Sequence, residues 1–225
     1  MAGDTFDVLV VCTGNVHRSP LGAMLLGTWA NWYLPPAVSG TVRVASAGTR
    51  APEGASMGRR ARAIATALGG DGREHRARQV TEAQLRAADL VLVASRRHRE
   101  RVIELVPGTL RTAFTMREAG RIAASLRLPA PPASVAELRS VVVGLAGNRA
   151  LGVGDEDVID PQGGPDDDYL RMAAEEVPAL ASLAGLLLGM PAAEVAAYRD
   201  ASYGPELLAG REGAGGQPGT GRRRK

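Results

Sequence analysis

The chain has 225 residues, 45% of them hydrophobic, which is enough to bury one ample core. Its single cysteine excludes an intramolecular disulfide, and no apolar run is long enough to span a membrane. The net charge of +3 arises from residues 209–225, which sum to +4 and leave −1 for the rest, so the remainder gives no indication of nucleic-acid binding. The start of the chain has no basic signal region, and we therefore expect a cytoplasmic protein.

Short apolar runs alternate with helical patterns along residues 1–190. Thr81 and Gln84 are spaced as a capping box, which predicts the start of one helix. Strands are expected at 8–11, 41–45, 90–94 and 110–114, and helices at 21–32, 56–68, 81–88, 96–105, 116–126, 134–145 and 166–188. This alternation indicates an α/β fold with a parallel sheet and helices on both faces. Residues 191–208 favour one short extra helix, and the Gly-rich basic tail at 209–225 should be disordered.

The loop Cys12–Arg18 follows a β-branched run and precedes a helical segment that opens at Ser19-Pro20. Strand, tight loop and helix in this order place several backbone N–H groups around an anion. Cys12 and Arg18, spaced as C-x5-R, supply a nucleophile and a fork that holds two phosphate oxygens. Ser19 can donate a hydrogen bond to the sulfur when it leaves. The residues expected to contact the substrate in this loop are Thr13, Gly14, Asn15, Val16 and His17.

The segment VCTGNVHRSP resembles the phosphate loop of the low-molecular-weight protein tyrosine phosphatases. The segments SAGT at 46–49, HRARQVT at 75–81 and DVIDPQGG at 157–164 resemble the same family, in the same order. The resemblance implies a three-layer, doubly wound fold whose four-stranded sheet has the order 2-1-3-4. It also implies hydrolysis of phosphotyrosine in proteins through a cysteinyl-phosphate, with phosphate as product and no cofactor. Residues 1–190 would then be one phosphatase domain, with a helical insertion at about 120–156.

The resemblance assigns roles to three residues outside the loop. Asp160, followed by Pro161, matches the general acid of the family, although Asp, Pro and Gly are also the commonest residues of a plain turn. Ser46 and His75 match a network that supports Asn15 and keeps the strained loop open. The alternative for His75 is an exposed side chain between charged neighbours.

Four positions depart from the family pattern. Pro52 and Gln162 stand where relatives often carry aromatic rings, and such stacking is worth about 0.5–1.5 kcal/mol beyond area burial. His17 replaces a second cysteine, and Val16 replaces a threonine that relatives acting on phosphoarginine carry. Val16 therefore favours phosphotyrosine. Phosphoarginine, a small-molecule phosphate, and a non-catalytic phosphate-binding module remain alternatives.

An acidic cluster formed by Asp155, Glu156, Asp157 and Asp160 could be interpreted as a metal site. Acidic loops are usually solvated, and the cysteinyl-phosphate chemistry needs no metal, so we expect neither a metal nor another cofactor. The expected partner is a phosphorylated protein, without nucleic acid or membrane. The sequence does not predict the oligomeric state.

Overall fold

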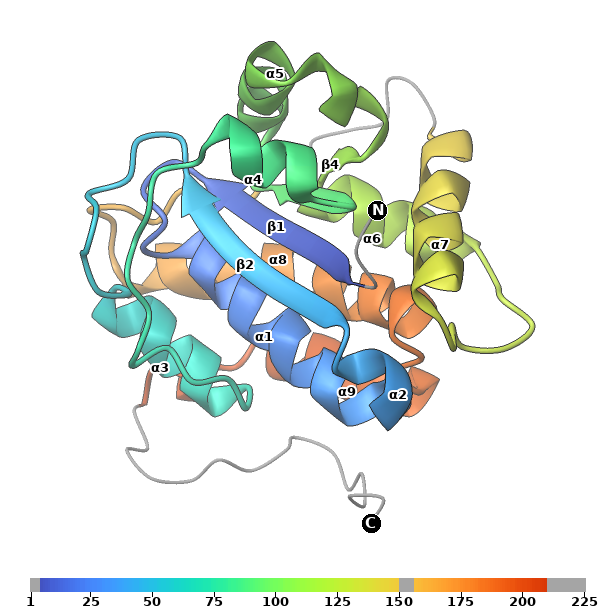
Figure 1. Ribbon diagram of the computed structural model, residues 1–225. Coiled ribbons are helices and arrows are strands. Elements are labelled where there is room, and N and C mark those ends of the chain that lie inside the picture. Colours follow the sequence, from blue (N-terminus) through green and yellow to red (C-terminus); the bar gives the residue numbers. More distant parts are fainter. Residues whose placement is uncertain (1–4, 150–155, 210–225) are drawn as a thin grey trace.

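The computed structural model describes residues 5–149 and 156–209, which form one parallel sheet between layers of helices (Figure 1). The sheet has four strands in the order β2-β1-β3-β4. The strands are β1 (Phe6–Cys12), β2 (Val42–Gly48), β3 (Leu90–Val93) and β4 (Ala113–Thr115). The predicted α/β class and strand order are thereby confirmed.

Helices cover both faces of the sheet. Side chains of β1 alternate, so Val8, Val10 and Cys12 enter the larger apolar core, whereas Leu9 and Val11 enter the smaller one. Helices α1 (Arg18–Tyr33), α3 (Arg59–Ala67), α6 (Met116–Ser125), α7 (Val135–Gly147) and α8 (Asp166–Leu187) contribute to the larger core. Helices α4 (Glu82–Ala87) and α5 (Arg96–Leu105) close the opposite face, above the sheet in Figure 1.

The carboxyl ends of the strands meet where the chain order reverses. Cys12 at the end of β1 pairs in register with Gly48 of β2, and Val11 pairs with Val93 of β3. The connections after β1 and after β3 therefore leave the sheet on either side of one crevice. This topological switch point is where open α/β sheets bind their ligands, and it contains the loop Cys12–Arg18.

Three local predictions were wrong in detail. Helix α3 begins at Arg59 rather than at residue 56, because the Gly58 N–H donates to the Val16 carbonyl (2.8 Å) and ties this segment to the loop. Strand β4 begins at Ala113 rather than at residue 110, because Pro107–Arg111 forms a 3₁₀ turn, η1. The short helix α2 (Pro36–Ser39) was not predicted.

The two tryptophans of α1 have different neighbours. Trp29 is fully buried against Tyr198 of α9 (Ala192–Ala201), with ring centroids 4.7 Å apart. Trp32 is 37% exposed and lies against Tyr33 and Gly69. The residues 191–208 thus form α9 and the 3₁₀ turn η2 (Pro205–Leu208).

The proposed domain division stays a prediction. Helix α7 lies within the expected insertion at 120–156 and packs on α6 and α8. Residues 210–225 of the expected disordered tail, and residues 150–155 of the expected insertion, lie outside the described residues. Within the described part, no helix combines the length and the apolar character that a membrane crossing requires.

Candidate active site

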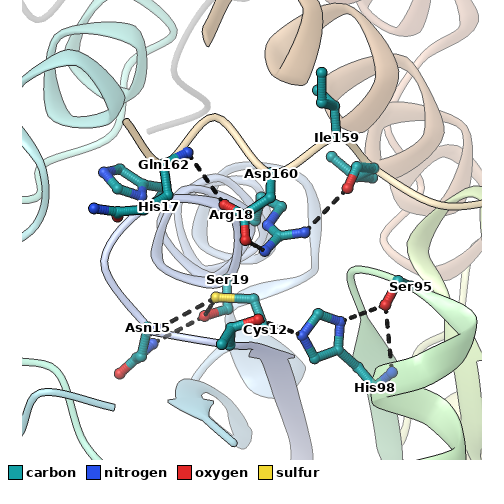
Figure 2. Close-up of polar contacts among 12 residues, drawn as sticks. Cys12, Asn15, His17, Arg18, Ser19, Ser95, His98, Ile159, Asp160 and Gln162 are labelled. Atoms are coloured by element: carbon teal, nitrogen blue, oxygen red, sulfur yellow. Dashed lines mark hydrogen bonds and ion pairs between the residues drawn. The ribbon is translucent and has the colours of Figure 1, made fainter. Parts of the chain in front are cut away.

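The floor of the crevice is the side chain of Cys12, at the end of β1. Its thiol is buried, and its Sγ lies 3.0 Å from Ser19 Oγ and 3.3 Å from the backbone nitrogen of Asn15, which donates to it (Figure 2). Both groups can donate to sulfur, and donors of this kind stabilise a thiolate more than a thiol. The surroundings of Cys12 therefore suit a nucleophile and a leaving group.

The loop turns sharply at Asn15, which has a φ of 53°. This left-handed conformation costs a non-glycine residue on the order of 1–3 kcal/mol unless its surroundings hold it. Asn15 Nδ2 donates to Ser19 Oγ (3.0 Å) and Ser46 Oγ (2.9 Å), and its Oδ1 accepts from the Arg78 N–H (3.0 Å). The side-chain amide is thus bonded on both ends, and it fixes the turn to β2 and to the segment after His75.

His75 holds the same turn through the main chain. Its Nε2 lies 2.7 Å from the carbonyl oxygen of Asn15. A carbonyl only accepts, so Nε2 carries the proton and donates. Burial lowers the pKa of His75 and favours the neutral ring, whereas this hydrogen bond acts in the opposite direction. His75 is 7% exposed, so the alternative of an exposed surface histidine is wrong.

Gly48 lets β2 lie directly against the loop. A Cβ at this position would be 2.5 Å from the carbonyl oxygen of Thr13, a distance that no side chain tolerates. The next N–H groups along the chain, those of Thr49 and Arg50, donate to the carbonyls of Cys12 and Thr13, both at 2.9 Å. The SAGT segment therefore supports the loop by close backbone contact as well as through Ser46.

Arg18, at the first position of α1, is 4% exposed and points into the crevice beside Asp160 (Figure 2). Its Nη1 donates to the carbonyl of Val158 (3.1 Å) and its Nη2 to Asp160 Oδ2 (2.5 Å). Asp160 Oδ1 also accepts from the Gln162 N–H at 3.2 Å, the hydrogen bond of a local turn. Asp160 thus forms a turn and faces the phosphate loop at once, so the two interpretations of the Asp-Pro sequence are compatible.

The loop, Arg18 and Asp160 enclose a cavity of about 250 Å³. It is lined by Cys12, Thr13, Gly14, Val16, His17, Arg18, Pro52, Asp160 and Gln162. Within the described part of the chain, the N–H groups of Gly14, Val16 and His17 have no protein acceptor. They lie next to the N-terminus of α1, so they can bind an anion.

His17 forms one wall of the cavity. It packs edge-on against Tyr169 of α8, with ring centroids 5.3 Å apart, and its Nε2 is 3.4 Å from the Tyr169 hydroxyl. Burial lowers the pKa of His17 and outweighs the opposite effect of Asp160. Tyr169 itself does not line the cavity. The walls formed by Pro52 and Gln162 therefore have no aromatic ring beside them from α8.

The acidic residues near Asp160 are paired with arginines. Glu156 Oε1 accepts from Arg121 Nη2 (2.7 Å), and Asp157 Oδ1 accepts from the N–H of Arg96 (2.8 Å). Across residues 5–149 and 156–209, no three His, Cys, Asp or Glu side chains are placed to hold a metal ion. Asp155, the fourth residue of the cluster, lies outside the described residues.

Sequence analysis missed three residues behind the cavity. His98, in the first turn of α5, contacts Thr13 of the loop, and Ser95, the N-cap residue of α5, contacts His98. Glu176 of α8 is fully buried behind Arg18, beside Gly22 of α1. A signal existed for Glu176, because Met172, Ala173, Glu176 and Leu180 follow one helical face. No local pattern pairs His98 with Thr13, which is 85 positions away.

Residues 7–142 match the family model described as low molecular weight phosphotyrosine protein phosphatase. The chain belongs to this family. Among its curated relatives, the probable low molecular weight protein-tyrosine-phosphatase AmsI of Erwinia amylovora is 36% identical over 101 residues, which are 45% of this chain. The matched part spans 64% of AmsI, less than two thirds of its length. A protein-arginine-phosphatase of Geobacillus stearothermophilus is 32% identical over 113 residues, 50% of this chain and 70% of that protein.

Solved structures of the family share the fold. The crystal structure of AmsI has a TM-score of 0.59 at 22% identity, over 81% of this chain and 93% of AmsI. The YwlE arginine phosphatase from Geobacillus stearothermophilus has a TM-score of 0.56 at 26% identity, over 80% and 90% of the two chains. Family members described as tyrosine phosphatases and as arginine phosphatases are thus both similar to this chain.

Proposed function

We propose that this family member is a phosphomonoester hydrolase that acts on phosphotyrosine in proteins through a cysteinyl-phosphate intermediate. The observation that carries the proposal is that Cys12, Arg18 and Asp160 line one cavity together with loop residues whose N–H groups have no acceptor among the described residues. A nucleophile, a cation and a carboxyl group are the parts that such a reaction needs.

In the first step the Cys12 thiolate attacks phosphorus, and the bond from phosphorus to the ester oxygen breaks. Arg18 exchanges its ion pair with Asp160 for the phosphoryl oxygens, which also bind the loop N–H groups. Asp160, which takes up a proton when it leaves Arg18, transfers this proton to the leaving oxygen and becomes a carboxylate again. The products are the free alcohol or phenol and phosphocysteine.

In the second step a water molecule attacks the phosphocysteine. Asp160 accepts the proton of this water as the new oxygen–phosphorus bond forms and the sulfur–phosphorus bond breaks. Ser19, 3.0 Å from Cys12 Sγ, donates to the departing thiolate. Phosphate is released, and both Cys12 and Asp160 return to their initial states.

The residues that form the walls of the cavity indicate which class of substrate it accepts. Val16 lacks the hydroxyl that the resemblance associates with phosphoarginine, which favours an aryl phosphate. Phosphoarginine is the second candidate, because the chain is also similar to arginine phosphatases. The presence of Asp160 and Ser19 argues against a module that only binds phosphate. The single cysteine fits a reducing cytoplasm, where we expect the protein to act on phosphorylated proteins.

The role of Asp160 can be tested with two leaving groups in single-turnover measurements. Phenoxide from phosphotyrosine needs a proton, because the pKa of its conjugate acid is about 10, whereas p-nitrophenolate needs it much less. We expect Asp160→Asn to slow phosphoenzyme formation roughly 10²–10⁴-fold with phosphotyrosine, the usual range for general acid catalysis. The loss with p-nitrophenyl phosphate should be clearly smaller.

An equal loss with both substrates would remove Asp160 from the proton-donor role. Turnover of phosphotyrosine, phosphoserine and phosphoarginine peptides by the wild-type chain then decides the substrate class. Preferential hydrolysis of the phosphoarginine peptide would replace the phosphotyrosine proposal by the second candidate. No turnover of any of the three would leave a small-molecule phosphate as the substrate, or a module that only binds phosphate.

A further inference from the structure

Behind the loop, a chain of three polar side chains runs from α5 to the rim of the cavity. Ser95 Oγ lies 2.6 Å from His98 Nδ1, and His98 Nε2 lies 2.8 Å from Thr13 Oγ1 (Figure 2). Ser95 and His98 are each 8% exposed, and Thr13 lines the cavity. We propose that His98 is a positioning residue, which, oriented by Ser95, forces the Thr13 hydroxyl to donate its hydrogen bond to the bound phosphoryl group.

The direction of the hydrogen bonds follows from Ser95. Its oxygen caps α5 by accepting from the backbone N–H of His98 at 3.3 Å. Within the described residues, the other group in contact with this hydroxyl is His98 Nδ1. A buried hydroxyl proton needs an acceptor, and Nδ1 is the acceptor present, so Ser95 donates to Nδ1.

A neutral imidazole that accepts at Nδ1 must carry its proton on Nε2. Burial lowers the pKa of His98 to about 4, and the charge of Arg18 acts in the same direction. Asp160 and Asp157 oppose this effect, whereas Arg97 adds to it. The ring is therefore neutral near pH 7, and its Nε2–H donates to Thr13 Oγ1.

Thr13 receives this hydrogen bond and keeps its own proton for another acceptor. In the described part of the structure, its hydroxyl contacts no protein group besides His98. An anion in the cavity supplies the acceptor, which makes Thr13 a donor beside the N–H groups of the loop. The inference rests on the proposed function only in the identity of that anion.

The tautomer can be measured without any turnover. The chain has three histidines, so ring ¹⁵N spectra contain few signals, and those of His98 are identified by their loss in His98→Phe. At pH 7 we expect a neutral ring protonated at Nε2. A ring protonated at Nδ1, or a charged ring, would overturn the proposal.

Binding of vanadate, measured by its displacement with inorganic phosphate, tests the role of the Thr13 hydroxyl. Thr13→Val should weaken binding roughly 10- to 100-fold, the range for a hydrogen bond to a charged group. The conservative Thr13→Ser should restore most of the loss. His98→Phe should weaken binding as well, and adding Thr13→Val to it should cost little more, because without His98 the Thr13 hydroxyl is no longer directed at the anion. Unchanged binding in Thr13→Val, or losses that multiply in the double variant, would contradict the proposal.

A capping serine elsewhere provides the matched control. Ser134 caps α7 by accepting from the Glu137 N–H (3.2 Å), as Ser95 caps α5. Both Ser95→Ala and Ser134→Ala should lose about 1 kcal/mol of stability from the missing cap. Ser95→Ala alone should also shift His98 toward the other tautomer and weaken vanadate binding several-fold. Equal vanadate binding in the two variants would leave Ser95 with only a structural role.

Failure of this inference and failure of the proposed function are distinguishable. A chain that binds vanadate through Thr13 but hydrolyses no phosphomonoester would retain the hydrogen-bond chain and lose the enzymatic proposal. A chain that hydrolyses phosphotyrosine with unchanged affinity in Thr13→Val would do the opposite.

Discussion

Two regions lie on opposite sides of the first turns of α1, and their buried polar side chains differ in how completely they are hydrogen-bonded. On the loop side, the Asn15 side chain makes three hydrogen bonds, one of them to Ser46, and His75 adds another to the same turn. On the α8 side, Glu176 is completely buried, and within the described residues neither of its carboxylate oxygens makes a hydrogen bond of ordinary geometry. Gly22 leaves room for this carboxyl, because a Cβ there would lie 2.9 Å from Oε1.

The difference shows where this molecule requires a defined geometry. Loop groups face a site for an anion, so small displacements of their hydrogen bonds would change its binding and reaction. The contact between α1 and α8 requires only that its volume be filled. A carboxyl group without a hydrogen bond of ordinary geometry can therefore be buried there. Burial raises the pKa of Glu176 well above its ordinary value, against the opposing effects of Arg18 and the Gly22 N–H.

The largest effect is expected on the loop side, from Cys12→Ser. A serine hydroxyl is a far weaker nucleophile, so turnover should fall below about one per cent of wild type. Vanadate should still bind, because Arg18 and the loop N–H groups remain. Burst kinetics with p-nitrophenyl phosphate and vanadate titration are the measurements, and residual turnover above that level would exclude a covalent intermediate on Cys12.

Two substitutions at Asn15 separate the effect of its side-chain amide from the effect of its left-handed backbone. Asn15→Ala removes the amide and leaves an alanine in a left-handed conformation, whereas Asn15→Gly removes the amide without backbone strain. Both should lower kcat/KM about tenfold or more, since each 1.4 kcal/mol of lost transition-state stabilisation is tenfold. In urea unfolding, the alanine variant should be less stable than the glycine variant by about 1 kcal/mol. Equal stability of the two would show that the backbone at Asn15 is not strained.

The smallest effect on activity is expected on the α8 side, from Glu176→Gln and Glu176→Leu. A carboxyl whose pKa is raised on folding takes up a proton, so the wild-type stability should fall as pH rises above the ordinary value of 4.5. The slope is at most about 1.4 kcal/mol per pH unit. Both variants should lose this slope, and Glu176→Leu should also gain about 1–3 kcal/mol by removing an unbonded buried group.

Urea unfolding at pH 5 and pH 8 measures this difference, and turnover provides the control. Because Glu176 does not line the cavity, we expect both variants to change kcat by less than about threefold. A wild-type stability that does not fall between pH 5 and pH 8 relative to Glu176→Gln would mean that Glu176 is charged. A large loss of kcat would assign it to the support of Arg18 instead.

Sequence patterns predicted the parts of the fold that depend on neighbouring residues. Three local patterns lie where a strand or helix was expected. They are the β-branched run of β1, the capping box at Thr81 and the helical pattern of α8. The start of α3 was misplaced because Gly58 is bonded to Val16, a contact between distant segments. The separate neighbours of Trp29 and Trp32 likewise depend on α9, which the helix pattern of α1 does not contain.

The candidate site divides in the same way. Cys12, Arg18 and Ser19 share one short motif, and the resemblance added Ser46, His75 and Asp160, which the fold brings next to it. His98 was missed because its role depends on the packing of α5 against the end of β1. Glu176 was missed because a charged side chain is rarely buried without a partner, so composition indicates a surface position.

The ion pair between Arg18 and Asp160 gives the resting protein an anion of its own. A substrate must displace this carboxylate from Nη2 before its phosphoryl group can occupy the guanidinium. A ligand with two negative charges competes better against one carboxylate than a ligand with a single charge, so the pair discriminates by charge before any chemistry occurs. In the proposed mechanism, the residue that donates the proton therefore also controls access to the guanidinium, and it becomes available for proton transfer only after a doubly charged ligand has replaced it.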